Sequence, residues 1–413
     1  MLDFFRDIFS PFFNMSKEEF KKACYFSMAF FFVLFTYALL RPSINSIFLS
    51  RHGGIKTPYV LLYSSISLLL FISYFNKAIV KMGALGIFNS CSFLFGSLFL
   101  MGLTFQNYLG DAFLAYFFYV LKEVYIVLLV HGLISFSNSY YNIKTAKSLL
   151  GPLGAIGSLG GILGGLLLSN FVPVLGTRFF VILSSILIFV PPIFLKLAKF
   201  PNSIGPVVKT KFDSPFESIG GVKAYVLLIC LVVAISQFCI GVATYKFDLY
   251  VTDFFPLKDQ KTAYMAKIFT TITTATFFFQ IFLTPVLLKY VSLRALQLFF
   301  PLFFTVMAVV EIILGGQFIL LPSVGFILYK AFDYSLFSSS KEILYYHLTG
   351  LQKFGAKYFA DMFSYRFSKG LVALLLIFLG QKMSLAFLGL IFLIFWGICV
   401  ILLFRIQSKI KSH

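Results

Sequence analysis

Long runs of apolar residues, separated by short polar or charged stretches, follow one another along almost the whole chain. About 20 apolar residues in a helix cross the roughly 30 Å hydrocarbon core of a bilayer. The pattern predicts about twelve transmembrane helices, at residues 23–41, 58–76, 83–104, 112–136, 149–171, 177–197, 224–245, 264–288, 294–314, 317–337, 364–380 and 383–404. We therefore expect an all-α membrane protein, because a helix satisfies its own backbone hydrogen bonds inside lipid.

One long interior segment breaks this pattern. Residues 198–223 are rich in proline, glycine, serine and lysine, which is typical of a linker. We expect two six-helix halves, 23–197 and 224–404, flanked by a cytoplasmic or interfacial segment 1–22 and a cytoplasmic tail 405–413. Two packed six-helix halves are the plan of major-facilitator-type transporters.

Composition supports the membrane prediction and excludes several functions. Of the 413 residues, 60% are hydrophobic and only 12% are charged, which is too few polar residues to cover a soluble surface. The five cysteines form no C-x-x-C pair and the four histidines form no H-E-x-x-H motif. These patterns predict no disulfide framework and no metal site. We expect no cofactor, no catalytic residues and no enzyme activity, because nucleophile and ATPase motifs are also missing from the sequence.

The net charge of +19 is explained by topology rather than by a polyanion partner. With an even number of spans, most lysines and arginines fall in loops on the side of the termini. Cytoplasmic loops of membrane proteins carry this excess, so both termini are expected in the cytoplasm. A bacterial inner membrane is the expected location, with the lipid bilayer as partner and no nucleic acid.

Ionisable residues at membrane depth are costly and mark candidate functional sites. Lys122 and Glu123 fall near the middle of the fourth predicted span, and Arg41 closes the first. Adjacent residues of a helix point about 100° apart. We therefore expect Lys122 and Glu123 to have separate partners or to face a wet cavity.

Further charged residues form a second set of candidates. Lys246 closes the seventh predicted span, and Lys330 and Asp333 lie three apart in the tenth, where they could also pair with each other. A cavity with this mixture of charges suits an anionic or zwitterionic solute better than a sugar or an apolar drug.

The fifth predicted span carries a regular series of glycines. Gly157, Gly161 and Gly165 recur every four residues, and Gly160 and Gly164 repeat the spacing one step away. Small residues at this spacing let two helices approach closely in lipid. We interpret the series as a packing surface rather than a phosphate-binding loop, since no Gly-Lys-Ser/Thr follows it.

Residues 335–345 read SLFSSSKEILY, residues 355–361 read GAKYFAD and residues 368–370 read SKG. Residues 30–41 read FFFVLFTYALLR, and residues 142–157, NIKTAKSLLGPLGAIG, follow Glu123. These segments resemble the nucleotide transporter family, the ATP/ADP translocases of plastids and obligate intracellular bacteria. The family's corresponding motifs include S-L-F-D-P-x-K-E-M-A-Y, K-G-K-A-A-x-D, G-K-S-G and M-F-F-x-I-L-F-N-Y-x-x-L-R. The likeness is patchy but colinear over most of the chain.

The resemblance implies exchange of nucleotides, typically ATP for ADP. It places the family's acidic position of the fourth span at Glu123, and two family lysines at Lys357 and Lys369. Lys341 and Glu342 lie in the best-matching segment. One departure matters, because Ile44 stands where the family has a lysine implicated in substrate binding.

The sequence thus predicts a secondary transporter that alternates access by rocking two halves about a midplane site. Its substrate would be a small anionic solute such as a nucleotide. The predicted substrate-binding residues are Arg41, Lys122, Glu123, Lys357 and Lys369, with Lys246, Lys330, Asp333, Lys341 and Glu342 as secondary candidates. Two alternatives stay open: an ion- or proton-coupled transporter of a different solute, and a transporter-like protein without transport activity. The sequence leaves the oligomeric state open.

Overall fold

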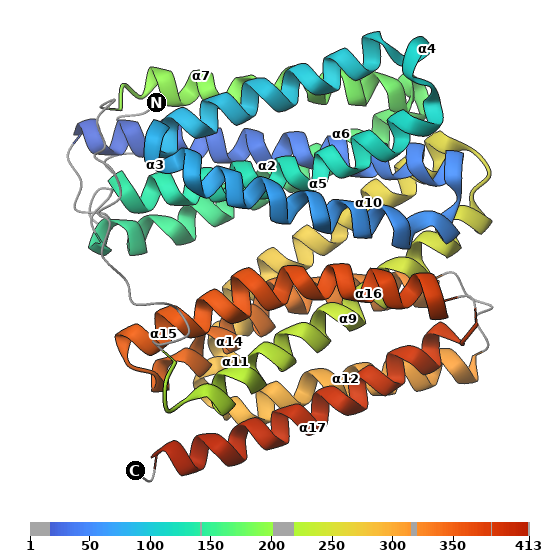
Figure 1. Ribbon diagram of the computed structural model, residues 1–413. Helices are drawn as coiled ribbons and strands as arrows, with labels where there is room; N and C mark the ends of the chain where they lie inside the picture. The colour runs from blue at the N-terminus through green and yellow to red at the C-terminus, as the bar shows by residue number, and fades with distance from the viewer. Residues whose placement is uncertain (1–16, 141–142, 201–218, 315–319, 381, 412–413) are drawn as a thin grey trace. The chain divides into compact units, whose positions relative to one another are not determined.

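The chain is helical in every region that the computed structural model describes, which are residues 17–140, 143–200, 219–314, 320–380 and 382–411 (Figure 1). The helices are α2 (Lys17–His52), α3 (Thr57–Thr104), α4 (Gln106–Leu109), α5 (Asp111–Tyr140), α6 (Ile143–Leu187), α7 (Val190–Leu197), α9 (Lys223–Phe254), α10 (Lys258–Phe278), α11 (Thr284–Tyr290), α12 (Leu293–Ile313), α13 (Leu320–Phe332), α14 (Ser338–Leu344), α15 (Gly350–Lys357), α16 (Tyr365–Leu379) and α17 (Leu385–Lys411). Short 3-10 segments are η1 (Gly54–Lys56) and η4 (Tyr345–His347), and π-helical segments are η2 (Phe279–Leu283), η3 (Asp333–Phe337) and η5 (Tyr358–Ser364). Most of the predicted segments 1–22 and 198–223 lies outside the described residues.

The helices agree with the predicted spans. In the described residues, ten helices are long and apolar enough to cross a membrane. One of these, Gly154–Leu197, holds two predicted spans, 149–171 and 177–197. The tenth predicted span is divided between α13 and η3, so no single α-helix covers it. The all-α class with about twelve transmembrane helices is confirmed.

The helix α6 breaks at Gly176, whose φ of 77° suits glycine because it has no Cβ. Thr177 starts the second part of the helix, and its backbone N–H and its hydroxyl donate to Asp259 Oδ1 at 2.9 Å and 2.5 Å. A carboxylate at this position accepts a hydrogen bond from a backbone N–H that has no partner within the helix. Its negative charge also interacts favourably with the positive end of the helix dipole. Asp259, in the first turn of α10, therefore caps a helix that begins far away in the sequence.

The chain forms two compact units. Unit 1 comprises Met1–Arg51, Ser67–Lys209 and Pro256–Thr273, and unit 2 comprises His52–Ile66, Thr210–Phe255 and Thr274–His413. The predicted boundaries of two six-helix halves remain a prediction.

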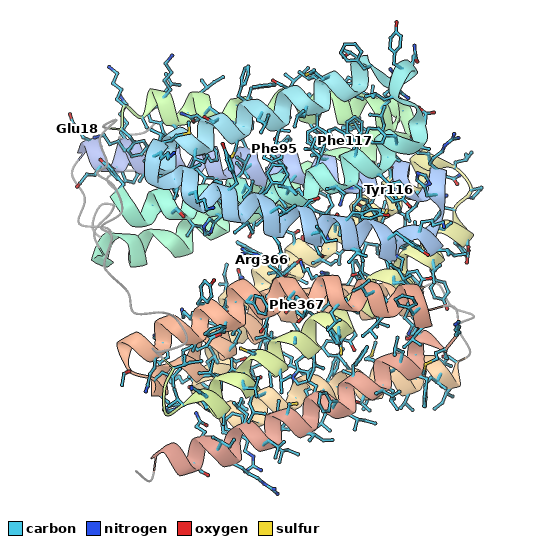
Figure 2. All side chains as sticks on the ribbon, viewed as in Figure 1. Glu18, Phe95, Tyr116, Phe117, Arg366 and Phe367 are labelled. Atoms are coloured by element: carbon cyan, nitrogen blue, oxygen red, sulfur yellow. The ribbon has the colours of Figure 1, made fainter. Side chains whose placement is uncertain are left out.

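Aromatic and aliphatic side chains fill the interior of unit 1. Phe48 of α2 packs edge-on against Tyr116 of α5 with 5.1 Å between ring centroids, and Phe95 of α3 meets Tyr125 at 6.0 Å (Figure 2). A second cluster joins α2, α6 and the first half of α10 through Leu39, Leu168, Val172, Phe180 and Ala266.

The glycine series of α6 is a packing surface, as predicted. A Cβ at Gly160 would lie 2.4 Å from the carbonyl oxygen of Phe31, and one at Gly164 would lie 2.6 Å from that of Phe35. The neighbouring stripe faces α10, since a Cβ at Gly165 would lie 2.0 Å from the Thr270 hydroxyl. Glycine at these positions lets α6 lie against the backbone of α2 and the side chains of α10.

Unit 2 is built around α9, which packs against α16 and α17 (Figure 1) and also against α13. Its core includes Trp396 of α17, stacked on Phe300 of α12 at 6.2 Å and edge-on to Phe337 at 5.5 Å. Two of its π-helical segments contact each other, and Gln280 of η2 donates a hydrogen bond of 2.9 Å to the carbonyl oxygen of Tyr334 in η3. A π-helical turn inserts an extra residue into a helix and often marks a functional site.

Candidate functional site

In unit 1, Lys122 and Glu123 pair with each other. The Lys122 Nζ atom lies 2.7 Å from Glu123 Oε1 and 3.5 Å from the centroid of the Tyr119 ring. The Lys122 side chain is fully buried, whereas that of Glu123 is 28% exposed. This direct pair was not expected, and it is possible because the lysine stem is long and flexible enough to reach a neighbour whose Cα–Cβ bond points about 100° away. The expectation of separate partners or a wet cavity remains a prediction.

Arg41 occupies a different place in unit 1. Its guanidinium lies 3.9 Å from the centroid of the Phe269 ring of α10 and 5.8 Å from that of Tyr37. Stacking on an aromatic face stabilises a partly desolvated cation. Ile44, one turn further along α2, is completely buried. It therefore contributes packing where the resembling family has a lysine.

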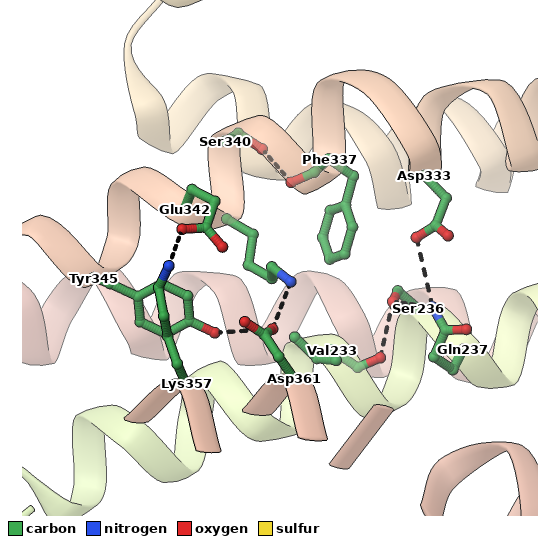
Figure 3. A network of polar contacts seen from close by, with 11 residues as sticks. Val233, Ser236, Gln237, Asp333, Phe337, Ser340, Glu342, Tyr345, Lys357 and Asp361 are labelled. Carbon is green, nitrogen blue, oxygen red and sulfur yellow. Dashed lines mark hydrogen bonds and ion pairs between the residues drawn. The ribbon is translucent and has the colours of Figure 1, made fainter. Parts of the chain in front are cut away.

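In unit 2, residues 335–345, the segment most similar to the nucleotide transporter family, contribute one residue to each of two neighbouring ion pairs (Figure 3). Lys341 Nζ lies 2.5 Å from Asp361 Oδ1, and Lys357 Nζ lies 2.5 Å from Glu342 Oε2. Neighbouring residues of α14 thus bind to neighbouring turns of α15 and η5. The Lys341–Asp361 pair is the more buried, with side-chain exposures of 13% and 27% against 39% and 42%.

Tyr345 extends this network. Its hydroxyl lies 3.3 Å from Asp361 Oδ1, and the Lys357 Nζ atom lies 5.5 Å from the centroid of its ring. Burial raises the pKa of the Tyr345 hydroxyl far above its usual range, and the negative charges of Asp361 and Glu342 raise it further. The hydroxyl therefore stays neutral and donates to the carboxylate.

Asp333 interacts with several charged residues of unit 2. Its carboxylate accepts a hydrogen bond of 3.5 Å from the Gln237 amide of α9 (Figure 3). Lys330, Lys341 and Lys369 lie within electrostatic reach of it. Three of the predicted lysines, from α13, α14 and α16, thus act on one partly buried acid.

Lys246 lies apart from this group. Its Nζ atom lies 2.7 Å from Glu311 Oε2 of α12, and both side chains are mostly buried, at 14% and 17% exposed. The pair borders a cavity of about 50 Å³ between α9, α12, α13 and α17. We call this space the Lys246 cavity.

We call Lys330, Lys341, Lys357 and Lys369 the lysine cluster. Together with Asp333, Glu342 and Asp361 it carries one net positive charge. Ion pairs hold Lys341 and Lys357 in place, and the excess of lysines over acids leaves a positive charge that an anionic ligand can neutralise. The arrangement is therefore suited to binding an anion. No group of three or more metal-ligating side chains occurs in the described part of the chain.

Some partners in this site are not evident from the sequence. Asp361 stands out only as part of a motif, and neither Tyr345 nor Gln237 stands out. For two of these the spacing gives a partial signal: Tyr345 follows Lys341 by four residues and Asp361 follows Lys357 by four, which places each beside a predicted lysine. The spacing does not give the observed pairing of Lys341 with Asp361. Gln237 had no such signal, since it reaches Asp333 across 96 residues of sequence.

No protein-family model matches the chain, and no curated protein matches it. Its fold does match solved structures. A mutant form of the nucleoside transporter NupG has a TM-score of 0.71 at 11% identity, with 93% of this chain and 99% of that chain covered. The POT family transporter PepTSo has a TM-score of 0.67 at 12% identity, with 95% and 98% covered. The xylose transporter XylE from E. coli, in an inward-open conformation, has a TM-score of 0.61 at 11% identity, with 93% and 95% covered.

These likenesses extend over nearly the whole of each chain, and at such low identity they establish the fold. The chain is a multi-pass membrane protein with a major-facilitator-like fold. The comparisons give no support to the ATP/ADP translocase family in particular.

Proposed function

We propose that this protein is a secondary transporter that moves a small anionic solute across a membrane by alternating access, with exchange of nucleotides as its leading form. The observation that carries the proposal is the full-length likeness to three transporters of nucleosides, peptides and xylose. The lysine cluster supports the anionic substrate, because phosphate and carboxylate groups are the natural partners of clustered lysines.

Within this proposal, Lys357 and Lys369 bind the negative charge of the substrate, supported by Lys341 and Lys330. Arg41 and the partly exposed Glu123 are the candidates in unit 1, and the buried Lys122 acts as a positioning residue for Glu123. We expect exchange because an empty carrier would have to reorient with the net positive charge of the lysine cluster unneutralised. We place the protein in a bacterial inner membrane with both termini in the cytoplasm, which reporter fusions at each end would test.

The direct test measures the binding of ATP, ADP and GTP to the purified protein. Binding is detected as a rise in the thermal unfolding temperature of the protein in detergent. A ligand that binds only the folded state stabilises it by about 2.7 kcal/mol at 100 times its Kd. We expect Lys357→Ala to weaken this effect about tenfold in affinity, because a charge-assisted contact is lost. Lys353→Ala is the matched control, since Lys353 lies one turn away on α15 and stacks on Tyr346 at 4.3 Å. An unchanged response in Lys357→Ala would contradict the assignment.

Exchange is tested in vesicles that contain the purified protein. Uptake of labelled nucleotide should depend on nucleotide inside the vesicle, because the loaded carrier reorients more readily than the empty one. Equal uptake into empty and preloaded vesicles would exclude obligatory exchange.

A second candidate is a proton- or ion-coupled transporter of a different small solute, and the fully buried Ile44 favours it. An apolar residue at the family's lysine position removes one positive charge from the expected nucleotide site. Coupled transport would have a pH optimum that moves in Glu123→Gln, whereas exchange would lose activity without such a shift.

A further inference from the structure

An arginine lies near the middle of one membrane span in unit 2. Arg366 follows Gly355 by eleven residues and precedes Leu379 by thirteen, and these two residues bound the span. Its side chain is partly buried, and it makes no hydrogen bond or ion pair with any residue that the structure describes. A charge at this depth is costly unless it faces the interior of the bundle or a water-filled space and has a partner there. Arg366 therefore differs from the lysines that are already neutralised by carboxylates.

The faces of α16 show where Arg366 lies on this helix. Ser368, Val372 and Leu376 recur every four residues and are buried. This face packs on α9, since a Cβ at Gly241 would lie 2.7 Å from Val372 Cγ1. Another face carries exposed phenylalanines, which suit contact with lipid: Phe363, Phe367 and Phe378. Successive residues turn by about 100° around a helix, so Arg366 lies between these two faces.

Protein covers the Arg366 side of α16 at the next turn. Gly370 follows Arg366 by four residues, which places the two on the same side of the helix. A Cβ at Gly370 would lie 3.5 Å from the Cβ of Ser65, in the part of α3 that belongs to unit 2. Arg366 thus lies beside a contact between two helices and away from the exposed phenylalanines.

The two cations of α16 are not held by carboxylates as the other lysines of unit 2 are. Lys341 and Lys357 each have a carboxylate oxygen at 2.5 Å. In the described part of the chain, Lys369 has no carboxylate at ion-pair distance, and its Nζ atom lies 4.8 Å from the centroid of the Tyr365 ring. Arg366 and Lys369 are three residues apart, and like charges one turn apart on a helix repel each other. An oxyanion between them would replace this repulsion by two attractive contacts.

We propose that Arg366 binds the oxyanion group of the transported solute directly, with Lys369 as a second contact to the same group. The inference rests on the proposed function and adds to it a binding residue. A guanidinium group presents a planar fork of N–H donors, which binds a phosphate or a carboxylate through two parallel hydrogen bonds. A lysine offers a point charge without this geometry. Arg366 would therefore fix the orientation of the charged end of the solute, and the lysine cluster would add attraction.

The test compares wild type and Arg366→Gln by thermal unfolding in detergent, first without a ligand and then with ADP, sodium pyrophosphate or citrate. Without a ligand, the variant should melt at the wild-type temperature or above it, because it loses a partly buried charge that has no ion pair among the described residues. Affinity for the anions should fall at least about tenfold, because a charge-assisted contact is lost. Arg405→Gln is the matched control, since Arg405 is exposed near the end of α17, and it should leave affinity unchanged.

A second variant, Arg366→Lys, separates charge from geometry. It keeps the positive charge and loses the fork, so its affinity should lie between those of wild type and Arg366→Gln. An Arg366→Gln protein that binds these anions as tightly as the wild type does would overturn the proposal. A lower melting temperature without a ligand, combined with unchanged affinity, would also overturn it and would assign Arg366 a structural role.

A third measurement needs no ligand. Arg366→Cys and Phe367→Cys are placed in vesicles and treated with a positively charged methanethiosulfonate reagent, and the wild type gives the background of the five native cysteines. Such a reagent attacks thiolates that water can reach. We expect Arg366→Cys to be modified and Phe367→Cys, on the face of the exposed phenylalanines, to stay unmodified. An unreactive Arg366→Cys would contradict a site that a dissolved anion can enter.

The three anions distinguish this inference from the proposed function. A wild type that responds to citrate but to neither phosphate compound would keep Arg366 as an oxyanion ligand and exclude nucleotide exchange. A response to ADP that is unchanged in Arg366→Gln would keep the nucleotide site and exclude this role of Arg366. No response of the wild type to any of the three anions would overturn both.

Discussion

The charged residues of unit 1 and unit 2 are arranged in opposite ways. In unit 1, Lys122 is paired with its sequence neighbour and Arg41 is stacked on an aromatic ring. In unit 2, the lysine cluster joins α13, α14, α15 and α16 through acids that come from other elements. The Lys122–Glu123 pair lies within α5, so this pair does not by itself join two helices. Charges neutralised between helices can change partners when a ligand enters.

The two units also differ in how closely their helices pack. Unit 1 contains the glycine series that brings α6 against the backbone of α2, whereas unit 2 contains the described π-helical segments and the Lys246 cavity. We infer that unit 1 depends on close packing for its stability and that unit 2 carries most of the charge chemistry. Four substitutions test this contrast.

The largest effect is expected at Gly164. A Cβ there would lie 2.6 Å from the Phe35 carbonyl oxygen, and backbone cannot move aside as a flexible side chain can. We expect Gly164→Val to destabilise the protein by about 3 kcal/mol or more, and to lower the yield of folded protein. Gly154→Val is the control, because a Cβ at Gly154 has nothing within 4 Å. Equal melting temperatures for the two variants would contradict the packing role.

Lys122→Met should have the next largest effect on stability. The change removes the ammonium group that lies 2.7 Å from the partly buried Glu123 carboxylate, at a cost of roughly 1–3 kcal/mol. The double variant Lys122→Met/Glu123→Gln should recover most of this loss, because it removes both charges. Thermal unfolding of the two variants side by side measures the coupling, and a double variant less stable than the single one would show that the pair has another role.

The same substitution in unit 2, Lys341→Met, should act mainly on binding. The Lys341–Asp361 pair is partly exposed, so its loss should lower stability by only about 1 kcal/mol or less. We expect nucleotide affinity, measured by thermal shift, to fall about tenfold. A stability loss larger than that of Lys122→Met, with affinity unchanged, would reverse the contrast between the units.

Tyr345→Phe should have the smallest effect. The lost hydrogen bond to Asp361 is long, at 3.3 Å, and we expect a change near 0.5 kcal/mol at neutral pH. The pH dependence is more informative. The pKa of Tyr345 is raised in the folded state, so its contribution is complete below the ordinary value of 10.0 and is lost as the pH rises above it. The difference in melting temperature between wild type and Tyr345→Phe should therefore shrink above about pH 10, and a constant difference would contradict a buried neutral phenol.

The positions of the helices could be predicted because lipid imposes one requirement on each span. A run of about 20 apolar residues is a local property, and α5, α12 and α17 lie close to the predicted ranges 112–136, 294–314 and 383–404. The π-helical turn at Asp333 could not be predicted, since an extra residue in a helix leaves the apolar pattern almost unchanged.

The candidate site was predictable residue by residue but not pair by pair. Charged residues within or beside apolar runs are conspicuous, so the lysines of unit 2 were named in advance. Their partners depend on tertiary packing, as with Lys341 and Asp361, which are 20 residues apart. The direct pair of Lys122 and Glu123 was not predicted for a different reason, because the direction of the Cα–Cβ bonds says little about where a long flexible side chain ends.

The cap that Asp259 gives to Thr177 has a consequence for the growing chain. The two residues are separated by 82 positions, so the second part of α6 leaves the ribosome well before its cap exists. At roughly 5–20 residues per second, the wait is on the order of ten seconds. During that interval the start of this helix has free N–H groups, and only the arrival of α10 completes it. Unit 1 is therefore assembled out of chain order, and a nascent chain truncated before residue 259 should be more open to proteolysis near Gly176 than one that extends past it.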